Sequence, residues 1–132
     1  MKQRARLFPL ATAVFLLGCP QRTAVWLEPG SSRSTLAFVI SNRRGNTNGI
    51  GIEGLRVDRC DANVDAPPQW MIVGTYGTAS AHRIRYGQLP EGFSTARQPE
   101  ALSTGCYRVT ISGTGRLRFD VRSDGSVVES VD

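Results

Sequence analysis

From residue 23 onward, apolar and polar residues mostly alternate, and glycine, proline, serine and threonine interrupt the alternation about every ten residues. An alternation of period two places every second side chain on one face, which is typical of half-buried β-strands. Patterns with the helical period are nearly absent. We therefore expect strands at residues 23–28, 34–42, 51–60, 69–76, 82–86, 106–112, 116–122 and 126–131.

The inward face of the expected strand 34–42 consists of alternate apolar residues, namely Leu36, Phe38 and Ile40. In the expected strand 51–60, Cys60 is out of phase with the apolar set. A bulge or a strand end just before Cys60 would explain that phase.

This number of short strands favours an all-β fold, a small antiparallel β-sandwich of seven or eight strands that is immunoglobulin-like. A small β-barrel is the alternative. The domain is expected to cover residues 24–132. A tight turn at Asp124-Gly125 would place Asp120 opposite Glu129. The long connection 87–105 is expected to be irregular, and to be either functional or a crossover between two sheets.

The chain begins with a charged segment followed by an apolar one. Lys2, Arg4 and Arg6 precede residues 7–17, which contain no charged side chain. This order is typical of an export signal peptide. The apolar run is well short of the roughly 20 residues that a membrane-spanning helix needs, so no transmembrane helix is expected.

The apolar run ends in Leu16-Leu17-Gly18-Cys19, which resembles the lipobox of bacterial lipoproteins. The resemblance implies that residues 1–18 are removed as a signal peptide and that the Cys19 thiol carries a diacylglyceryl anchor. Residues 19–23 would then be a short acylated tether on a membrane of the cell envelope. Because Pro20, and not aspartate, follows the cysteine, the outer membrane is favoured. The alternative is that Cys19 is an ordinary cysteine.

Charge argues against a nucleic-acid partner once the signal peptide is removed. The whole chain carries a formal charge of +5, but three of its sixteen basic residues lie within residues 1–18. The remaining thirteen arginines face eleven acidic residues, which leaves about +2. An exported domain with so small an excess of positive charge is not expected to bind nucleic acid.

Two cysteines remain after Cys19 is assigned to the lipid. Cys60 and Cys106 are expected to form one disulfide, because the periplasm and the cell surface are oxidising. Two buried free thiols or a metal-binding pair are the alternatives. With His82 as the single histidine, a metal site is not favoured, and no cofactor is expected.

No motif indicates catalysis, and we expect a protein that is not an enzyme. His82 has no nucleophile motif beside it, and the chain contains no P-loop or dinucleotide fingerprint. The aspartates at 58, 61 and 65 are a weak alternative as calcium ligands. Arginines recur on the expected strands 82–86 and 116–122, and we favour a solvated sheet face over a binding surface for them.

The mature part also resembles uncharacterised small bacterial lipoproteins, a resemblance that implies no activity. The residues that carry it are Tyr86-Gly87, Pro90, Gly92-Phe93, Leu102, Gly105, Tyr107-Arg108-Val109, Phe119-Asp120-Val121 and Asp124-Gly125.

The expected function is that of a membrane-anchored, non-enzymatic interaction module with an envelope protein as its unidentified partner. Its candidate contacts lie on loops, where binding residues concentrate: Arg43 and Arg44 in the polar loop 43–49, and Phe93 in the connection 87–105. The alternative is an inhibitor or immunity-type protein that blocks an envelope hydrolase, with Phe93 inserted into the pocket of its target.

Overall fold

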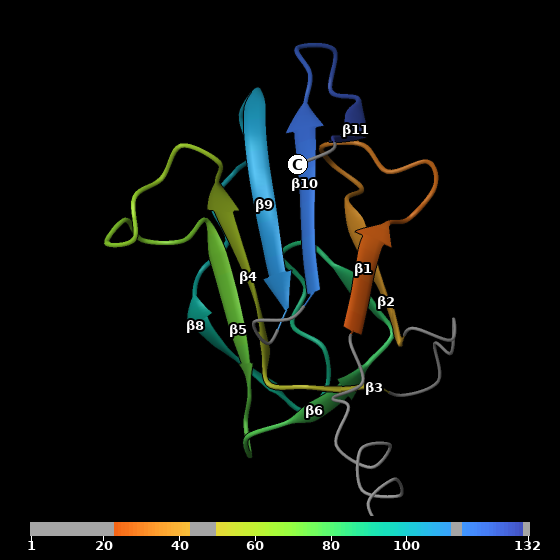
Figure 1. The fold of residues 1–132 in the computed structure, drawn as a ribbon, viewed down its shortest axis with the longest axis vertical. Coiled ribbons are helices and arrows are strands. Elements are labelled where there is room, and N and C mark those ends of the chain that lie inside the picture. The colour runs from red at the N-terminus through yellow and green to blue at the C-terminus, as the bar shows by residue number, and fades with distance from the viewer. Residues whose placement is uncertain (1–22, 43–49, 112–114, 131–132) are drawn as a thin grey trace, which may run out of the picture.

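The computed structural model describes residues 23–42, 50–111 and 115–130, and this part of the chain folds into antiparallel β-sheets without a helix (Figure 1). Accordingly, none of it forms a helix long and apolar enough to cross a membrane. The strands of the described residues are β1 (Thr23–Leu27), β2 (Ala37–Asn42), β3 (Ile50–Ile52), β4 (Gly54–Arg59), β5 (Trp70–Gly74), β6 (Ala79–Ala81), β7 (Arg83–Arg85), β8 (Phe93–Arg97), β9 (Gly105–Ile111), β10 (Gly115–Val121) and β11 (Val127–Ser130).

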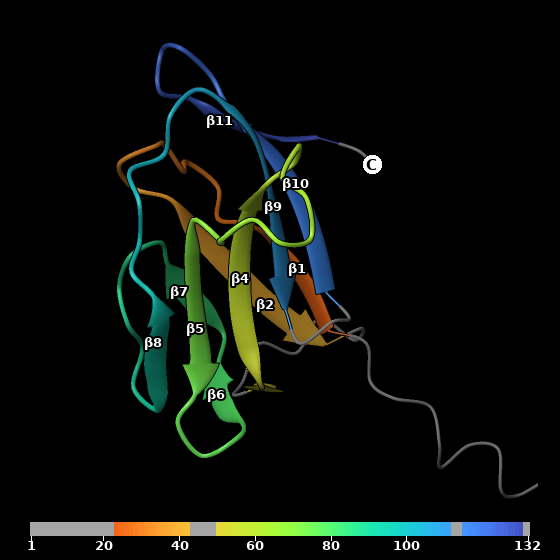
Figure 2. The same cartoon turned by 90° about the vertical axis from the view of Figure 1, so that its left-hand side faces the viewer.

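Two of the sheets face each other and form a β-sandwich, which confirms the predicted fold class (Figure 2). The smaller has the order β1-β2-β7, and the larger has the order β11-β10-β9-β4-β5-β8. In the smaller sheet the second strand lies between the first and the seventh, and in the larger sheet β9 lies between β4 and β10. This is the A-B-E and C-F-G order of an immunoglobulin-type sandwich, extended in the larger sheet by β11 at one edge and by β5 and β8 at the other.

The core fills the space between these sheets and is rich in aromatic rings. Phe119 of β10 lies 5.9 Å from Phe38 of β2 and 5.6 Å from Tyr107 of β9, measured between ring centroids. The predicted inward set of β2 is buried, as are alternate residues of β9 and β10. The buried apolar residues of the described part extend from Val25 of β1 to Val121 of β10.

The expected strand 51–60 is in fact two strands that belong to different sheets. β3 pairs with β6 in a separate two-stranded sheet, whereas β4 pairs with β5 and β9. The chain changes direction at Glu53, between the two strands, where the carbonyl of Glu53 accepts a hydrogen bond from the Gly74 amide. The described part therefore has eleven strands instead of seven or eight. Cys60 follows the end of β4, as its phase predicted.

The connection 87–105 crosses from the smaller sheet to the larger one, as one of the two expectations stated. It is less irregular than predicted, because it contains β8, which pairs with β5 at the edge of the larger sheet. Three consecutive residues of β8, Thr95 to Arg97, are exposed. The strand therefore lacks the apolar alternation from which a strand is predicted.

A disulfide and a tyrosine link the start of β9 to the end of β4 and to the chain that precedes β9. Cys60 and Cys106 are bonded, and the Cys60 amide donates to the Cys106 carbonyl at 3.1 Å. The bridge links neighbouring strands of one sheet, unlike the bridge between sheets in antibody domains. The Tyr107 hydroxyl donates to the Ser103 carbonyl at 2.9 Å and accepts from the Ser103 amide at 3.0 Å. This resembles the tyrosine corner of immunoglobulin-like domains.

The hairpin β10–β11 has a register that differs by one residue from the prediction. Asp120 lies opposite Val128, and Phe119 lies opposite Glu129. The reason is the turn, in which Arg122 pairs with Ser126 around three residues instead of two, with Gly125 at φ 87°. Because a shift of one residue reverses the two faces of a strand, Glu129 shares the side of Phe119, and Val128 faces outward.

Tyr86 provides a pH-dependent contribution to the stability of this fold. Its ring meets Trp70 edge-on at a centroid distance of 5.2 Å, and its hydroxyl donates to the Glu100 carbonyl at 2.6 Å. Burial, with smaller contributions from the charges of Tyr107 and Glu100, raises the pKa of Tyr86 from 10.0 to about 12. The folded state therefore favours the neutral phenol, and this contribution to stability is complete below pH 10.

We expect the free energy of unfolding to fall as the pH rises from 10 to about 12, the interval between the two pKa values of Tyr86. Chemical denaturation at several pH values measures this slope. In Tyr86→Phe the slope should be smaller in the same interval, because no phenol remains at this position. Equal slopes for the two proteins would contradict the assignment to Tyr86.

Candidate functional site

Three of the residues singled out in the sequence, Cys19, Arg43 and Arg44, lie outside the described residues. The described residues nearest to them in the chain are paired with each other. Thr23, four residues after Cys19, is the partner of Asn42, which directly precedes Arg43. The segment that contains Cys19 and the loop that contains Arg43 and Arg44 are therefore attached to the same end of the sandwich.

Phe93 was expected to be a contact residue, and this expectation is wrong. Its side chain is 5% exposed and belongs to the hydrophobic core, and its backbone pairs with Gly74 at the edge of the larger sheet. A ring packed in the core cannot enter the pocket of a partner without unfolding β8. The inhibitor hypothesis thereby loses the residue on which it depended.

The predicted disulfide between Cys60 and Cys106 is present. It lies at the end of the sandwich where β4 finishes and β9 begins, far along both strands from the end that carries Thr23. Both thiols are occupied by the bridge, so neither serves as a nucleophile or as a metal ligand. Nor do the histidines, cysteines and acidic residues of the described part gather into a group that could hold a metal ion.

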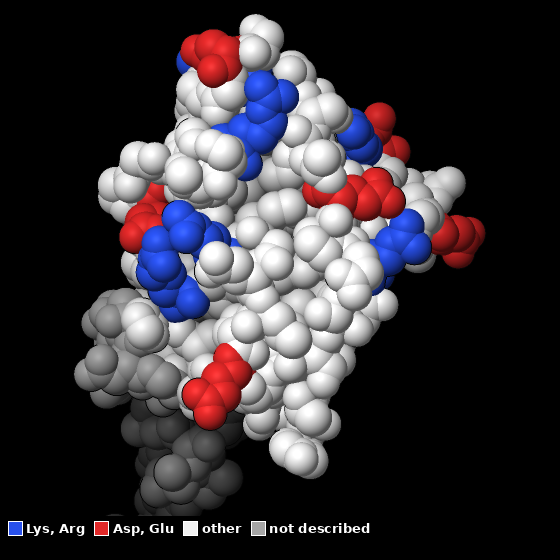
Figure 3. Space-filling view, turned by 180° about the vertical axis from the view of Figure 1, so that it is seen from behind, with Lys and Arg blue, Asp and Glu red and all other residues white. Residues whose placement is uncertain are grey.

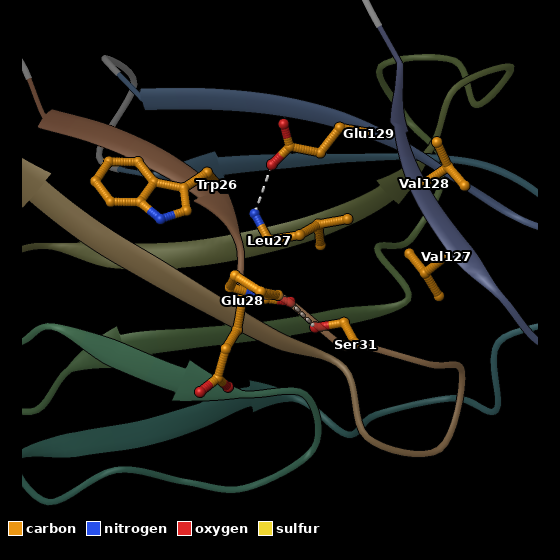
Figure 4. Close-up of a pocket in the computed structure, with 9 residues that line it drawn as sticks. Trp26, Leu27, Glu28, Ser31, Val127, Val128 and Glu129 are labelled. Atoms are coloured by element: carbon orange, nitrogen blue, oxygen red, sulfur yellow. Dashed lines mark hydrogen bonds between the residues drawn. The ribbon is translucent and has the colours of Figure 1, made fainter.

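An open groove of about 610 Å³ lies where the edge of the smaller sheet meets the edge of the larger one (Figure 4). We call it the edge groove. β1 and the loop after it form one wall, and β11 forms the other. Its lining consists of Trp26, Leu27, Glu28, Pro29, Gly30, Ser31, Val127, Val128 and Glu129.

Glu129 joins the two walls of the edge groove. Its carboxylate accepts a hydrogen bond of 2.7 Å from the Leu27 amide, which points away from β2 and toward the groove (Figure 4). The carboxylate thus replaces a neighbouring strand as the partner of an edge amide. Glu129 reaches this position because the hairpin register turns it toward the inner side of the sheet, together with Val127.

Glu28 stabilises the wall that β1 and the following loop form. Its carbonyl accepts a 2.7 Å hydrogen bond from the Ser31 hydroxyl, and its carboxylate forms a 2.8 Å ion pair with Arg83 of β7. The hydrogen bond from Arg83 lowers the pKa of the Glu28 carboxyl. Both acidic side chains of the edge groove are therefore bonded within the protein.

The edge groove has the features of a binding site for an extended segment. Its one hydroxyl side chain, that of Ser31, already donates to a carbonyl, and no histidine lines the groove. The exposed strand edges and the apolar Leu27 and Val127 can hold an extended segment by main-chain pairing and burial of side chains. The sequence pattern did not indicate this groove, because the predicted register placed Glu129 on the wrong face.

The arginines of the expected strands 82–86 and 116–122 lie on separate faces of the sandwich. Figure 3 shows the side of the smaller sheet, where basic side chains gather beside acidic ones and a broad area carries no charge. Arg83 is paired with Glu28 there, in agreement with a solvated face. On the other side, Arg118 donates to Cys106 Sγ at 3.0 Å, whereas Arg116 is exposed.

The comparisons with known proteins identified no relative. No protein-family model, no curated protein and no solved structure matches this chain.

Proposed function

We propose that this chain is a bacterial envelope lipoprotein, anchored through an acylated Cys19, whose β-sandwich is a non-enzymatic module that binds another envelope protein. The signal segment and the lipobox-like residues 16–19 support the anchor. The Cys60–Cys106 disulfide agrees with export, because such bridges persist in oxidising compartments. The outer membrane is the favoured location.

One observation carries the proposal: β1 starts four residues after Cys19 and leads away from the anchor toward the edge groove. Four extended residues span at most about 15 Å. The end of the sandwich that carries Thr23 is then held close to the membrane, and the edge groove opens about one strand length farther out. A groove raised above the headgroups in this way is accessible to a segment of a partner.

The anchor is tested by labelling the full chain in a bacterial host with an alkyne-bearing palmitate analogue, followed by membrane fractionation. We expect the wild-type protein to be labelled and to stay in the membrane fraction at high salt, because two or three acyl chains anchor stably. Cys19→Ser should lose both properties completely. Cys60→Ser/Cys106→Ser, which removes two cysteines but not the anchor, should keep the label. A labelled Cys19→Ser protein, or an unlabelled wild type, would refute the proposal.

The binding module is tested in the same cells with a photo-crosslinking residue. Placed at Val128, which is 38% exposed beside the edge groove, it should capture one reproducible envelope protein. The matched position is Tyr76, which is 95% exposed but lies in the turn after β5, outside the groove. Capture of the same set of proteins from both positions would contradict a specific role for the groove.

A further inference from the structure

The outer face of the larger sheet, which faces the reader in Figure 1, carries a row of arginines on adjacent strands. The register places Arg56 of β4, Thr110 of β9 and Arg116 of β10 side by side. Arg108 lies in the next row, opposite Asp58. Because adjacent strands are about 4.8 Å apart, these cationic side chains occupy one compact area.

This area is a hollow of about 450 Å³ and not a flat surface. The connection between β4 and β5 bends over the outer face of the sheet, so that Ala62, Asn63 and Val64 form a side wall (Figure 2). We call it the basic hollow. Its floor consists of strand residues of the larger sheet, among them Arg108 and Arg116.

The positive charge of the basic hollow is only partly neutralised. Arg56 donates to Asp58 at 2.8 Å and also to the carbonyl of Ala66. For the side chains of Arg108 and Arg116, the described residues supply neither an ion pair nor a hydrogen bond. Two guanidinium groups thus remain available for an anion, and the planar guanidinium matches a phosphate group through paired hydrogen bonds.

A second, apolar hollow of about 340 Å³ adjoins the basic one. Met71 and Val73 of β5 form its side, and Gly54 leaves space on β4. A Cβ atom at Gly54 would come within 2.6 Å of the Ile72 carbonyl oxygen, so a larger residue does not fit there. The two hollows share Arg56 and Thr110. Glu53 also lines the second hollow, at the turn between β3 and β4. A ligand that is anionic at one end and apolar at the other fits the arginines of the first hollow and the Met71 and Val73 side of the second.

The apolar hollow and Arg116 lie toward the end of the sandwich that carries Thr23, whereas Arg108 and the side wall lie farther along the strands. Gly115, the neighbour of Arg116, is packed so closely against Thr23 that a Cβ atom on it would lie 3.0 Å from the Thr23 carbonyl oxygen. Thr23 is separated from Cys19 by at most about 15 Å of chain. An acylated Cys19 would therefore hold Arg116 and the apolar hollow near the headgroups of the membrane.

From these observations we propose that the two hollows bind an anionic phospholipid of the membrane in which Cys19 is anchored. The phosphate occupies the basic hollow between Arg108 and Arg116. The part of the lipid next to the phosphate contacts Met71 and Val73. This assignment rests on the proposed anchor and adds a second contact with the same membrane. It keeps the end of the sandwich that carries Thr23 at the membrane, with the basic hollow farther out along the strands, and it leaves the edge groove accessible.

The test uses residues 20–132, which contain every strand of the described residues and lack only the signal segment and Cys19, so that its result does not depend on acylation. Co-sedimentation measures partitioning into phosphatidylcholine vesicles with and without phosphatidylglycerol. Each basic residue near an anionic surface contributes about fivefold to partitioning, so Arg108→Gln/Arg116→Gln should weaken binding about 25-fold. The control Arg33→Gln/Arg122→Gln removes the same charge at the opposite end, beside Gly125, and should change binding less than threefold.

Met71→Gln distinguishes a lipid from a free anion. It should weaken binding to anionic vesicles several-fold while both arginines remain in place. Three results would overturn the proposal: equal binding to neutral vesicles, equal losses for the two arginine pairs, or full displacement by inorganic phosphate together with no effect of Met71→Gln. The Cys19→Ser experiment is independent of all three, so failure of the anchor and failure of the lipid site are distinguishable.

Discussion

Loss of the Cys60–Cys106 bridge is expected to lower the free energy of unfolding by about 4 kcal/mol. The two cysteines are 46 residues apart in the chain, and the bridge closes this long loop in the unfolded state as well as in the folded one. Without it, the unfolded chain gains conformational entropy. Urea denaturation of the wild type, with and without reductant, and of Cys60→Ala/Cys106→Ala measures the effect.

The reduced wild type and the double alanine variant should unfold at similar urea concentrations, both well below the oxidised protein. Because the bridge joins neighbouring strands that are also linked by the ladder between β4 and β9, the folded state should keep its strands when the bridge is absent. Identical midpoints for the oxidised and reduced proteins would show that the loop contributes no entropy, and would contradict the prediction.

Phe119→Ala is expected to cost about 4 kcal/mol of unfolding free energy, which is typical for removal of a large buried aromatic side chain. The ring is fully buried, and it contacts Tyr107 in its own sheet and Phe38 in the facing sheet. Alanine would leave a cavity between the layers and remove both ring contacts. Thermal and urea unfolding of the purified variant provide the measurement.

Val128→Ala is the control for Phe119→Ala, because Val128 lies on the neighbouring strand and its side chain faces outward. It should change stability by no more than about 0.5 kcal/mol. Phe119→Leu should fall between the two, since leucine fills part of the cavity. If Phe119→Ala were as stable as Val128→Ala, the ring would not connect the two sheets energetically.

Much of the fold was predictable because a half-buried strand shows an alternation of apolar and polar residues within its own short segment. Leu36, Phe38 and Ile40 alternate with residues on the other face, and the structure buries all three. The two cysteines left after the lipobox were predicted to pair, and they do. Phe93 shows the limit of this method, because an aromatic residue in a connection without alternation can belong to a loop or to a core strand.

The candidate sites were less predictable, because each depends on the register between strands. The edge groove depends on the three-residue turn between β10 and β11, which places the Glu129 carboxylate beside the Leu27 amide. A two-residue turn would place the Glu129 side chain on the other face of the sheet. The basic hollow joins arginines that are up to 60 residues apart in the chain, from Arg56 to Arg116. No pattern within a short segment of the sequence specifies that these arginines lie close together.

Amino-acid order alone therefore determined the all-β class, the inward faces of the alternating strands and, because two cysteines remain beside Cys19, the choice of disulfide partners. It also predicts the export signal and the anchor at Cys19. The strands and the signal depend on patterns within a short segment. Tertiary structure decided the division of residues 50–59 between two sheets, the register of the β10–β11 hairpin and the convergence of arginines on one face. These features depend on turn geometry and on packing between distant strands, which a local pattern does not encode.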